Sequence, residues 1–105
     1  MNRSNLDQVY VEAPPAIVEI SGHRATFQVS GHLPNPAYKL DHLAVTVRGK
    51  IIEITPLAQH DPNKIVVQML VPFTESVEVE VPAPGEYTVR VLGRSQSQET
   101  QIKVP

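Results

Sequence analysis

The sequence predicts an all-β fold in which two sheets pack as a sandwich. Short apolar runs alternate with polar residues at a period of two, which is the pattern of half-buried strands. Ten prolines and five glycines divide these runs into pieces of ordinary strand length. No segment keeps apolar residues at the i, i+3, i+4, i+7 spacing over three turns, so we expect no substantial helix.

The length of 105 residues fits one domain with one core, which we expect to span residues 1–105, with the polar residues 1–6 disordered. The formal net charge is −2 and charges of both signs are interspersed, which predicts no nucleic-acid surface. No apolar run approaches the roughly 18 residues of a membrane-spanning helix, so we expect no such segment. The absence of cysteine excludes disulfides, thiolate metal sites and a cysteine nucleophile.

The first half of the chain predicts five strands. A proline pair, Pro14–Pro15, separates the first two, and because proline cannot donate to a ladder this break belongs at a sheet edge. We expect residues 31–41 to form a long irregular connection. Gly49 predicts a tight hairpin turn, and Pro56 is expected to end the fifth strand. The predicted strands are 9–11, 16–20, 24–30, 42–48 and 51–55.

The second half begins with an irregular connection over residues 57–63. Residues 64–71 are apolar on both faces, as in a strand covered on both sides, and we expect residues 64–81 to be one long strand bent at Pro72. Pro84–Gly85 predicts a turn, after which 86–92 has the clearest alternation in the chain. A polar turn over 93–98 leads to a last strand, 99–104.

Tyr87 has a second role in this interpretation. A tyrosine just after a turn and two residues before a buried position is the pattern of a tyrosine corner, in which the ring is buried and the hydroxyl bonds a backbone group upstream. This feature and the spacing of the turns predict an immunoglobulin-like Greek-key β-sandwich of about seven antiparallel strands.

Three segments add a family resemblance. Leu33–Pro34 followed by Tyr-Lys-Leu at 38–40, Leu-Val-Pro-Phe-Thr-Glu at 70–75, and Pro-Gly-Glu-Tyr-Thr-Val-Arg-Val at 84–91 together resemble uncharacterised immunoglobulin-like domains of bacterial secreted proteins and lipoproteins. The resemblance implies the same fold and an exported origin, and no particular activity. Members of that family usually carry a cysteine pair at the positions of Ala37 and Val66, so this chain lacks the family's disulfide.

The residue types that support chemistry are scattered. The four histidines show no metal-motif spacing, so we predict no metal and no cofactor; a weak set of His32, His60 and Asp61 would form only if their loops met. No serine lies in a Gly-x-Ser-x-Gly setting. Three glutamates, at positions 75, 78 and 80, lie among valines, and this pattern is typical of the solvent-exposed face of a strand. We therefore predict that the protein is not an enzyme.

A binding surface is predicted from strand direction. Successive antiparallel strands alternate in direction, so alternate connections lie at the same end, and residues 31–41, 57–63 and 93–98 share one end if 64–81 is a single strand. Long polar connections on a rigid sheet are common recognition sites. The predicted binding residues are His32, Asn35, Tyr38, His60, Asp61 and Arg94.

These observations favour a non-catalytic module of an exported bacterial protein that serves protein recognition, adhesion or scaffolding, with a protein partner of unspecified identity. The alternative is an inhibitor-like domain that presents the proline-braced loop 31–40 to a protease or another enzyme; a small hydrolase is a third, disfavoured class. We expect an extracytoplasmic location (secreted, periplasmic or lipoprotein-anchored), and the absence of cysteine is also compatible with the cytoplasm. The sequence specifies no oligomeric state.

Overall fold

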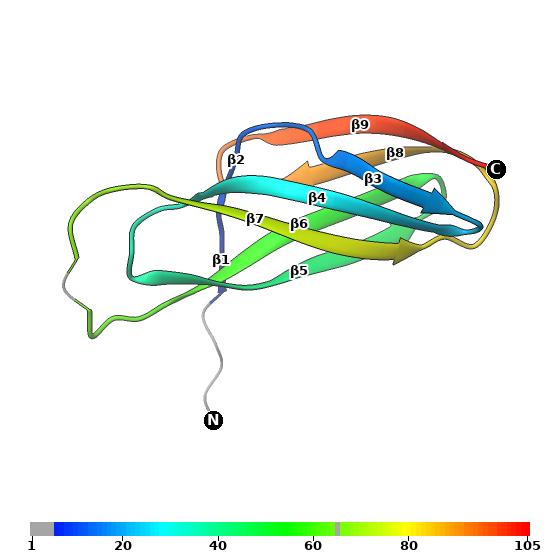
Figure 1. The fold of residues 1–105 in the computed structure, drawn as a ribbon. Coiled ribbons are helices and arrows are strands. Elements are labelled where there is room, and N and C mark those ends of the chain that lie inside the picture. Colours follow the sequence, from blue (N-terminus) through cyan, green and yellow to red (C-terminus); the bar gives the residue numbers. More distant parts are fainter. Residues whose placement is uncertain (1–5, 65) are drawn as a thin grey trace, which may run out of the picture.

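The computed structural model describes residues 6–64 and 66–105, which form nine strands and no helix (Figure 1). The all-β sandwich prediction is confirmed. No helix in the described part of the chain has the length and apolarity needed to span a membrane. The strands are β1 (Leu6–Gln8), β2 (Tyr10–Val11), β3 (Ala16–Ser21), β4 (Arg24–Leu33), β5 (Tyr38–Arg48), β6 (Ile51–His60), β7 (Val71–Glu80), β8 (Gly85–Leu92) and β9 (Ser97–Val104).

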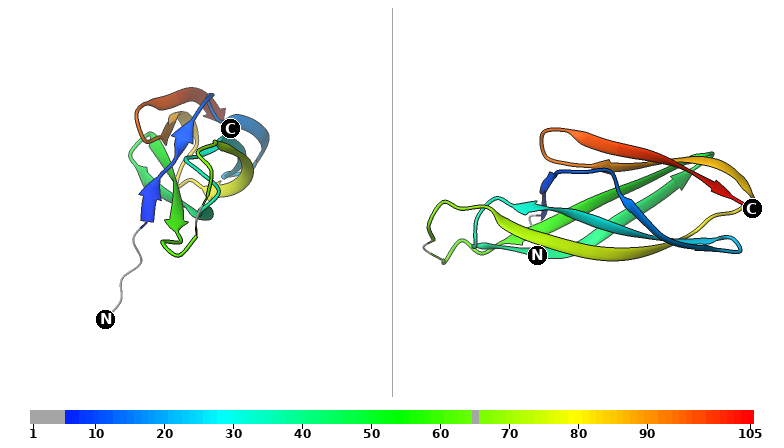
Figure 2. Two further views of the ribbon diagram at one scale, coloured as in Figure 1. Left: turned by 90° about the vertical axis from the view of Figure 1, so that its left-hand side faces the viewer. Right: turned by 45° about the horizontal axis from the view of Figure 1, so that its top comes forward.

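The strands form a five-stranded and a four-stranded sheet. In the five-stranded sheet β5 pairs with one edge of β6, while β8 and β1 share the other edge and β9 pairs with β8. In the four-stranded sheet β4 has β7 on one side and both β2 and β3 on the other. The resulting sandwich is elongated, with extents of 49 × 32 × 21 Å (Figure 2).

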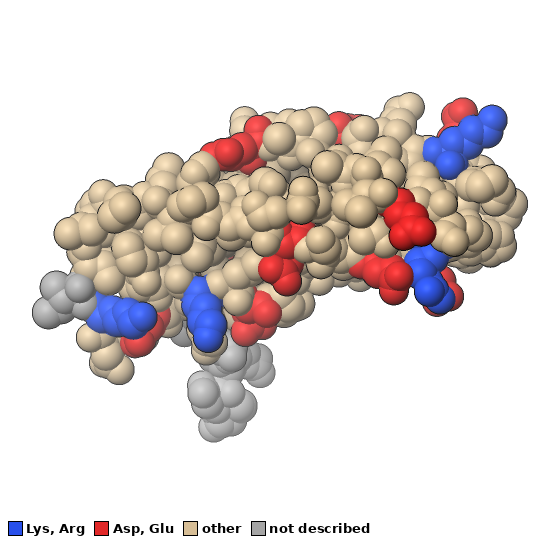
Figure 3. Space-filling view, in the orientation of Figure 1, with Lys and Arg blue, Asp and Glu red and all other residues tan. Residues whose placement is uncertain are grey.

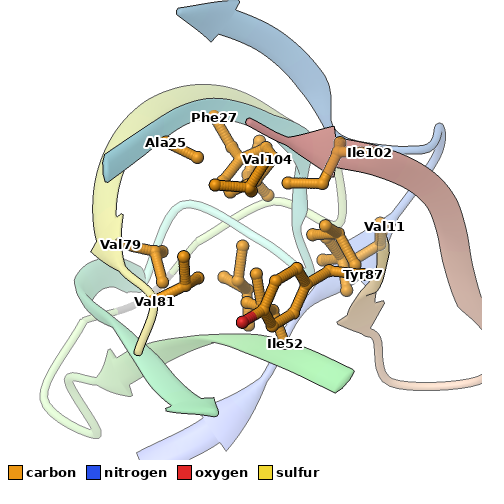
Figure 4. Packing of buried hydrophobic residues seen from close by; sticks show 13 residues of the cluster. Val11, Ala25, Phe27, Ile52, Val79, Val81, Tyr87, Ile102 and Val104 are labelled. Atoms are coloured by element: carbon orange, nitrogen blue, oxygen red, sulfur yellow. The ribbon is translucent and has the colours of Figure 1, made fainter. Parts of the chain in front are cut away.

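The core lies between the two sheets. Its main cluster combines the inward residues of β4, such as Phe27, with those of β6 and β8, such as Ile52 and Tyr87, all three fully buried (Figure 4). Val9, Leu33 and Ala58 form a second, smaller cluster. The period-two pattern of the sequence therefore correctly identifies the buried faces of β4, β6 and β8.

One pairing differs from the expected antiparallel pattern. β6 and β8 pair in parallel, with Ile51 opposite Thr88 and Ile54 opposite Val91. After β6 the chain crosses to the other sheet as β7 and then returns as β8. These two reversals leave β8 running in the direction of β6, so the pair is parallel.

Near the N-terminus one predicted boundary differs and one is confirmed. Leu6, expected in the disordered segment 1–6, begins β1 and pairs with Gln59; residues 1–5 lie outside the described residues. The Pro14–Pro15 break separates β2 from β3, which both lie on the outer side of β4, so its edge location is confirmed. The described residues form nine strands where about seven were expected, and β1 is the strand that none of the predicted ranges contains.

Pro56 does not end a strand, because β6 continues to His60. The N–H of Thr88 donates to the carbonyl of Lys50 at 2.9 Å, so the even-numbered backbone groups of β6 point toward the edge that β8 and β1 share. β8 pairs with residues 51–54 and β1 with residues 57–59. Pro56 lies at the gap between them, where a missing N–H removes no ladder bond.

The prediction of a buried strand over 64–71 is wrong. β7 begins only at Val71, whose partner Leu33 is the last residue of β4, so there is no strand of this sheet beside the preceding residues. Residues 66–70 are in a connection whose side chains are mostly exposed, and residue 65 lies outside the described residues. The connection predicted over 31–41 is shorter than expected: β4 and β5 extend into it and leave residues 34–37.

Candidate binding surface at the loop end

Three connections point toward the same end of the sandwich, as the strand directions predict. Residues 34–37, 61–64 and 66–70 lie at its extremity, which we call the loop end, whereas the connection after β8 stops short of it (Figure 1). It stops there because β8 pairs only with residues 51–54 of β6 and β1 occupies the rest of that edge. Arg94 therefore points the expected way but lies beside the N-terminal strands.

Two aromatic rings lie in contact at the loop end. Tyr38 and His60 are cross-strand partners of β5 and β6, with ring centroids 4.8 Å apart and an interplanar angle of 43°. The N–H of Asp61 donates to the carbonyl of Ala37 at 2.9 Å, which extends the pairing by one step. Tyr38 also packs against the smaller core cluster. The two rings are thereby held on a fixed backbone.

Asn35 and Asp61 shape the two turns beside this pair. The side-chain oxygen of Asn35 accepts from the N–H of Ala37 at 2.8 Å, and its carbonyl accepts from the N–H of Tyr38 at 3.1 Å. Asp61 Oδ1 accepts from the N–H of Asn63 at 3.0 Å, which confirms the turn predicted at Asp61. Both residues therefore have a structural role in addition to their position at the surface.

A groove of about 400 Å³ runs between these turns. Sequence reasoning missed three of its polar residues, Lys39, Gln59 and Lys64. It assigns Lys64 to a buried strand, and it does not select Lys39 and Gln59, although both lie in the predicted connections 31–41 and 57–63. Their position beside Tyr38 and His60 in the sequence was the available signal. The lining residues are Ala37, Tyr38, Lys39, Gln59, His60, Asp61, Pro62 and Lys64.

His32 and Arg94 belong to a different group, organised by Tyr10. His32 lies opposite Tyr10 in the β2–β4 pairing and contacts the carboxylate of Glu12. The Arg94 guanidinium lies over the Tyr10 ring, 5.7 Å from its centroid, and the Arg94 N–H donates to the carbonyl of Val9 at 2.8 Å. These contacts fix the N-terminal strands where they cross between the sheets, and neither residue lines the groove.

An exposed apolar segment lies at the loop end. Val67, Met69 and Leu70, which we call the apolar tip, have relative exposures of 65%, 56% and 52%. Within the described residues no backbone hydrogen bond joins residues 66–70 to another segment. Sequence reasoning expected these side chains to be buried, so the apolar tip is the main surface feature that it missed.

The described residues contain no cluster of side chains that could hold a metal ion. No three His, Asp or Glu side chains there converge on one point, so His32, His60 and Asp61 do not form the alternative metal set. The side chains of Glu75, Glu78 and Glu80 are all exposed. Glu78 and Glu80 lie on the solvent face of β7, whereas Glu75 is on the face that carries Phe73 and Val77. On the face in Figure 3 charges of both signs are scattered over a mostly uncharged surface.

The comparisons with known proteins identify a family. The model of the ORF11 beta-sandwich domain matches residues 27–104, from the middle of β4 to the end of β9. The strands that precede β4, and with them Tyr10, lie outside the matched region, whereas His32 and Arg94 lie within it. No curated protein and no solved structure matches the chain. The match covers most of the chain and agrees with the observed sandwich, so this chain belongs to the ORF11 beta-sandwich domain family.

Proposed function

We propose that this domain is a non-catalytic recognition module of an exported bacterial protein and that its loop end binds a protein partner. One observation carries the proposal: three large apolar side chains are more than half exposed at the loop end of the sandwich. Burial of such a side chain is worth about 1.5–3 kcal/mol. Folding of the chain leaves most of this apolar surface in contact with water, so its burial can stabilise a complex with a partner.

The scaffold beneath the apolar tip suits this role. The adjoining turns at 34–37 and 61–64 are fixed by backbone and side-chain hydrogen bonds, and the Tyr38–His60 pair lies beside them. A preorganised surface loses less conformational entropy when it binds. The exported, bacterial origin is supported by the sequence resemblance described above.

The inhibitor alternative lacks its required feature at residues 31–40. Most of these residues lie in β4 or β5, Ala37 is buried, and Pro34 and Pro36 are half-buried. An inhibitory loop presents an exposed apolar residue to its enzyme, and this segment presents none. The geometry therefore favours recognition through the apolar tip over inhibition through 31–40.

The test compares two double variants that add the same charge to exposed apolar pairs. Met69→Asp with Leu70→Asp changes the apolar tip, and Ile17→Asp with Val18→Asp changes exposed residues of β3 as the control. A partner captured from the source organism is identified and purified, and its affinity for each variant is measured by calorimetry. We expect the tip variant to lose affinity by at least about tenfold and the β3 variant to retain it.

Chemical denaturation of both variants accompanies this measurement. The tip side chains are exposed, so the tip variant should unfold within about 0.5 kcal/mol of the wild type. Equal affinity of the wild type and the tip variant for the purified partner would contradict the proposal.

A further inference from the structure

We propose that residues 66–70 act as a recognition strand, which pairs with an open sheet edge of the protein partner inside an apolar groove with an acidic rim. The inference rests on the proposed function above and adds to it the mode of binding and the chemistry of the partner.

The sequence of this segment is that of a strand covered on both faces. With a period of two, Val67 and Met69 point to one side, while Val66, Gln68 and Leu70 point to the other. Both sides are therefore mainly apolar, as in strands buried between two layers. Valine also has high strand propensity, and the segment contains no glycine, proline or charge.

In the structure this segment belongs to no sheet, and the chain bends at Gln68. It leads directly into β7, but β4 ends at Leu33 opposite Val71, so the segment extends past the end of its own sheet. The backbone groups of residues 66–70 form no hydrogen bond with any described residue. The side chains of the apolar tip are more than half exposed. The segment thus has free donors, free acceptors and uncovered apolar side chains, and an added sheet edge satisfies all three.

A lipid bilayer and a second copy of this segment are poorer binding partners than an open sheet edge. A lipid bilayer covers apolar side chains but offers no partners to the backbone N–H and C=O groups. A second copy of the segment forms a two-stranded ribbon of five residues a side, which leaves both faces uncovered. Such a ribbon also buries far less than the roughly 800 Å² per partner of a stable interface.

The charges beside the segment suggest the character of the groove's rim. Lys64 is exposed just before it, Lys39 lines the groove behind it, and neither forms an ion pair with a described residue. The acidic group in this groove is Asp61, whose Oδ1 is engaged by the Asn63 N–H. A partner with carboxylates around its apolar groove complements the two lysines and associates faster at low salt.

Identification of the partner begins with a photo-crosslinking amino acid at position 69 in the source organism, with position 18 as the control site. Purified domain and partner are then mixed, and backbone amide exchange is measured by mass spectrometry. We expect the amides of residues 66–70 to exchange at least about tenfold more slowly in the complex. Unchanged exchange over 66–70 in a formed complex overturns the strand-pairing proposal.

Proline variants test the backbone contact separately from the side chains. In a strand, successive N–H groups point to opposite edges, so we expect Val67→Pro or Gln68→Pro, but not both equally, to lower affinity by at least about tenfold. Val67→Ala and Gln68→Ala keep the N–H and serve as matched controls, with affinity losses of only a few-fold. Lys39→Glu with Lys64→Glu should slow association at low salt.

The results separate the two proposals. Loss of affinity in the aspartate tip variant, with neither proline variant below its alanine control, overturns strand pairing and leaves the proposed function standing. No loss in any variant overturns both. Crosslinks from position 69 to lipid together with binding to phosphatidylglycerol vesicles, or crosslinks to a second copy together with dimers in sedimentation, also overturn strand pairing to a partner protein.

Discussion

The hydroxyl of Tyr87 donates to the backbone carbonyl of Ala83, four residues earlier, at 2.7 Å. The tyrosine is 2% exposed, so its ring is in the core while its hydroxyl closes the turn that leads into β8. This geometry confirms the corner predicted from the sequence. Lys50 adds to it, because its ammonium lies 4.8 Å from the Tyr87 ring centroid and donates to the Pro84 carbonyl at 3.0 Å.

Replacement of Tyr87 by phenylalanine should lower the free energy of unfolding by about 1 kcal/mol, and by more if the Ala83 carbonyl stays unpaired. Urea denaturation measures the change. Tyr10→Phe is the matched control, because the Tyr10 hydroxyl bonds no described residue; its change should stay within about 0.5 kcal/mol. Equal values for the two variants would show that the corner hydrogen bond contributes nothing.

Gly31 lies where β2 passes close to β4. A Cβ at this position would overlap the carbonyl oxygen of Tyr10 and lie 3.1 Å from the Phe73 ring. Gly31→Ala should therefore destabilise the fold by about 1–3 kcal/mol and loosen β2 from β4. Thermal and urea unfolding measure the loss, and amide exchange at Tyr10 and Val11 reports the loosening.

Gly49→Asn is the control for this substitution. Gly49 has a φ of 58°, which asparagine tolerates, and open space around its Cβ position, so we expect a smaller loss than at Gly31. A stable Gly31→Ala variant with unchanged exchange would mean that β2 does not approach β4 as described.

Glu53 joins two arginines on the outer face of the five-stranded sheet. Its carboxylate oxygens lie 3.1 Å from Arg48 and 3.4 Å from Arg90, and its side chain is only 19% exposed. Glu53→Gln should cost about 1 kcal/mol at low salt and less at molar salt, because screening weakens the lost attraction. Glu80→Gln, at an exposed contact 3.9 Å from Arg24, should change stability by less than about 0.5 kcal/mol. A loss at Glu53 that does not depend on salt would argue against the ion pairs.

The fold should hold without any metal. A core of buried aliphatic and aromatic side chains is sufficient for a domain of this length, and the described residues contain no convergent ligand set. Melting curves with and without a chelator should therefore coincide. A fall of several degrees with chelator, restored by one divalent cation, would reveal a metal site that the sequence did not predict.

The sequence by itself determined the fold class and the buried faces of β4, β6 and β8. Alternation of apolar and polar residues is a local property, so it identified Phe27 in β4 and Val89 in β8 as core positions. The turn before Tyr87 likewise depends on a few neighbouring residues. Strand direction followed from counting reversals, which correctly directed the connection at Arg94 toward the loop end.

Only the tertiary structure decided which strands lie side by side and where each one ends. Pro56 remains inside β6 because a gap between β8 and β1 faces it, and no local pattern reveals that gap. Arg94 lies beside Tyr10, away from His60, because β1 occupies the rest of the β6 edge. Residues 66–70 carry the pattern of a covered strand, but β4 ends at Leu33 and leaves them without a neighbour. Removal of apolar side chains from water is favourable. The surface that buries them comes from strands distant in the sequence or from another protein, so a local pattern does not identify it.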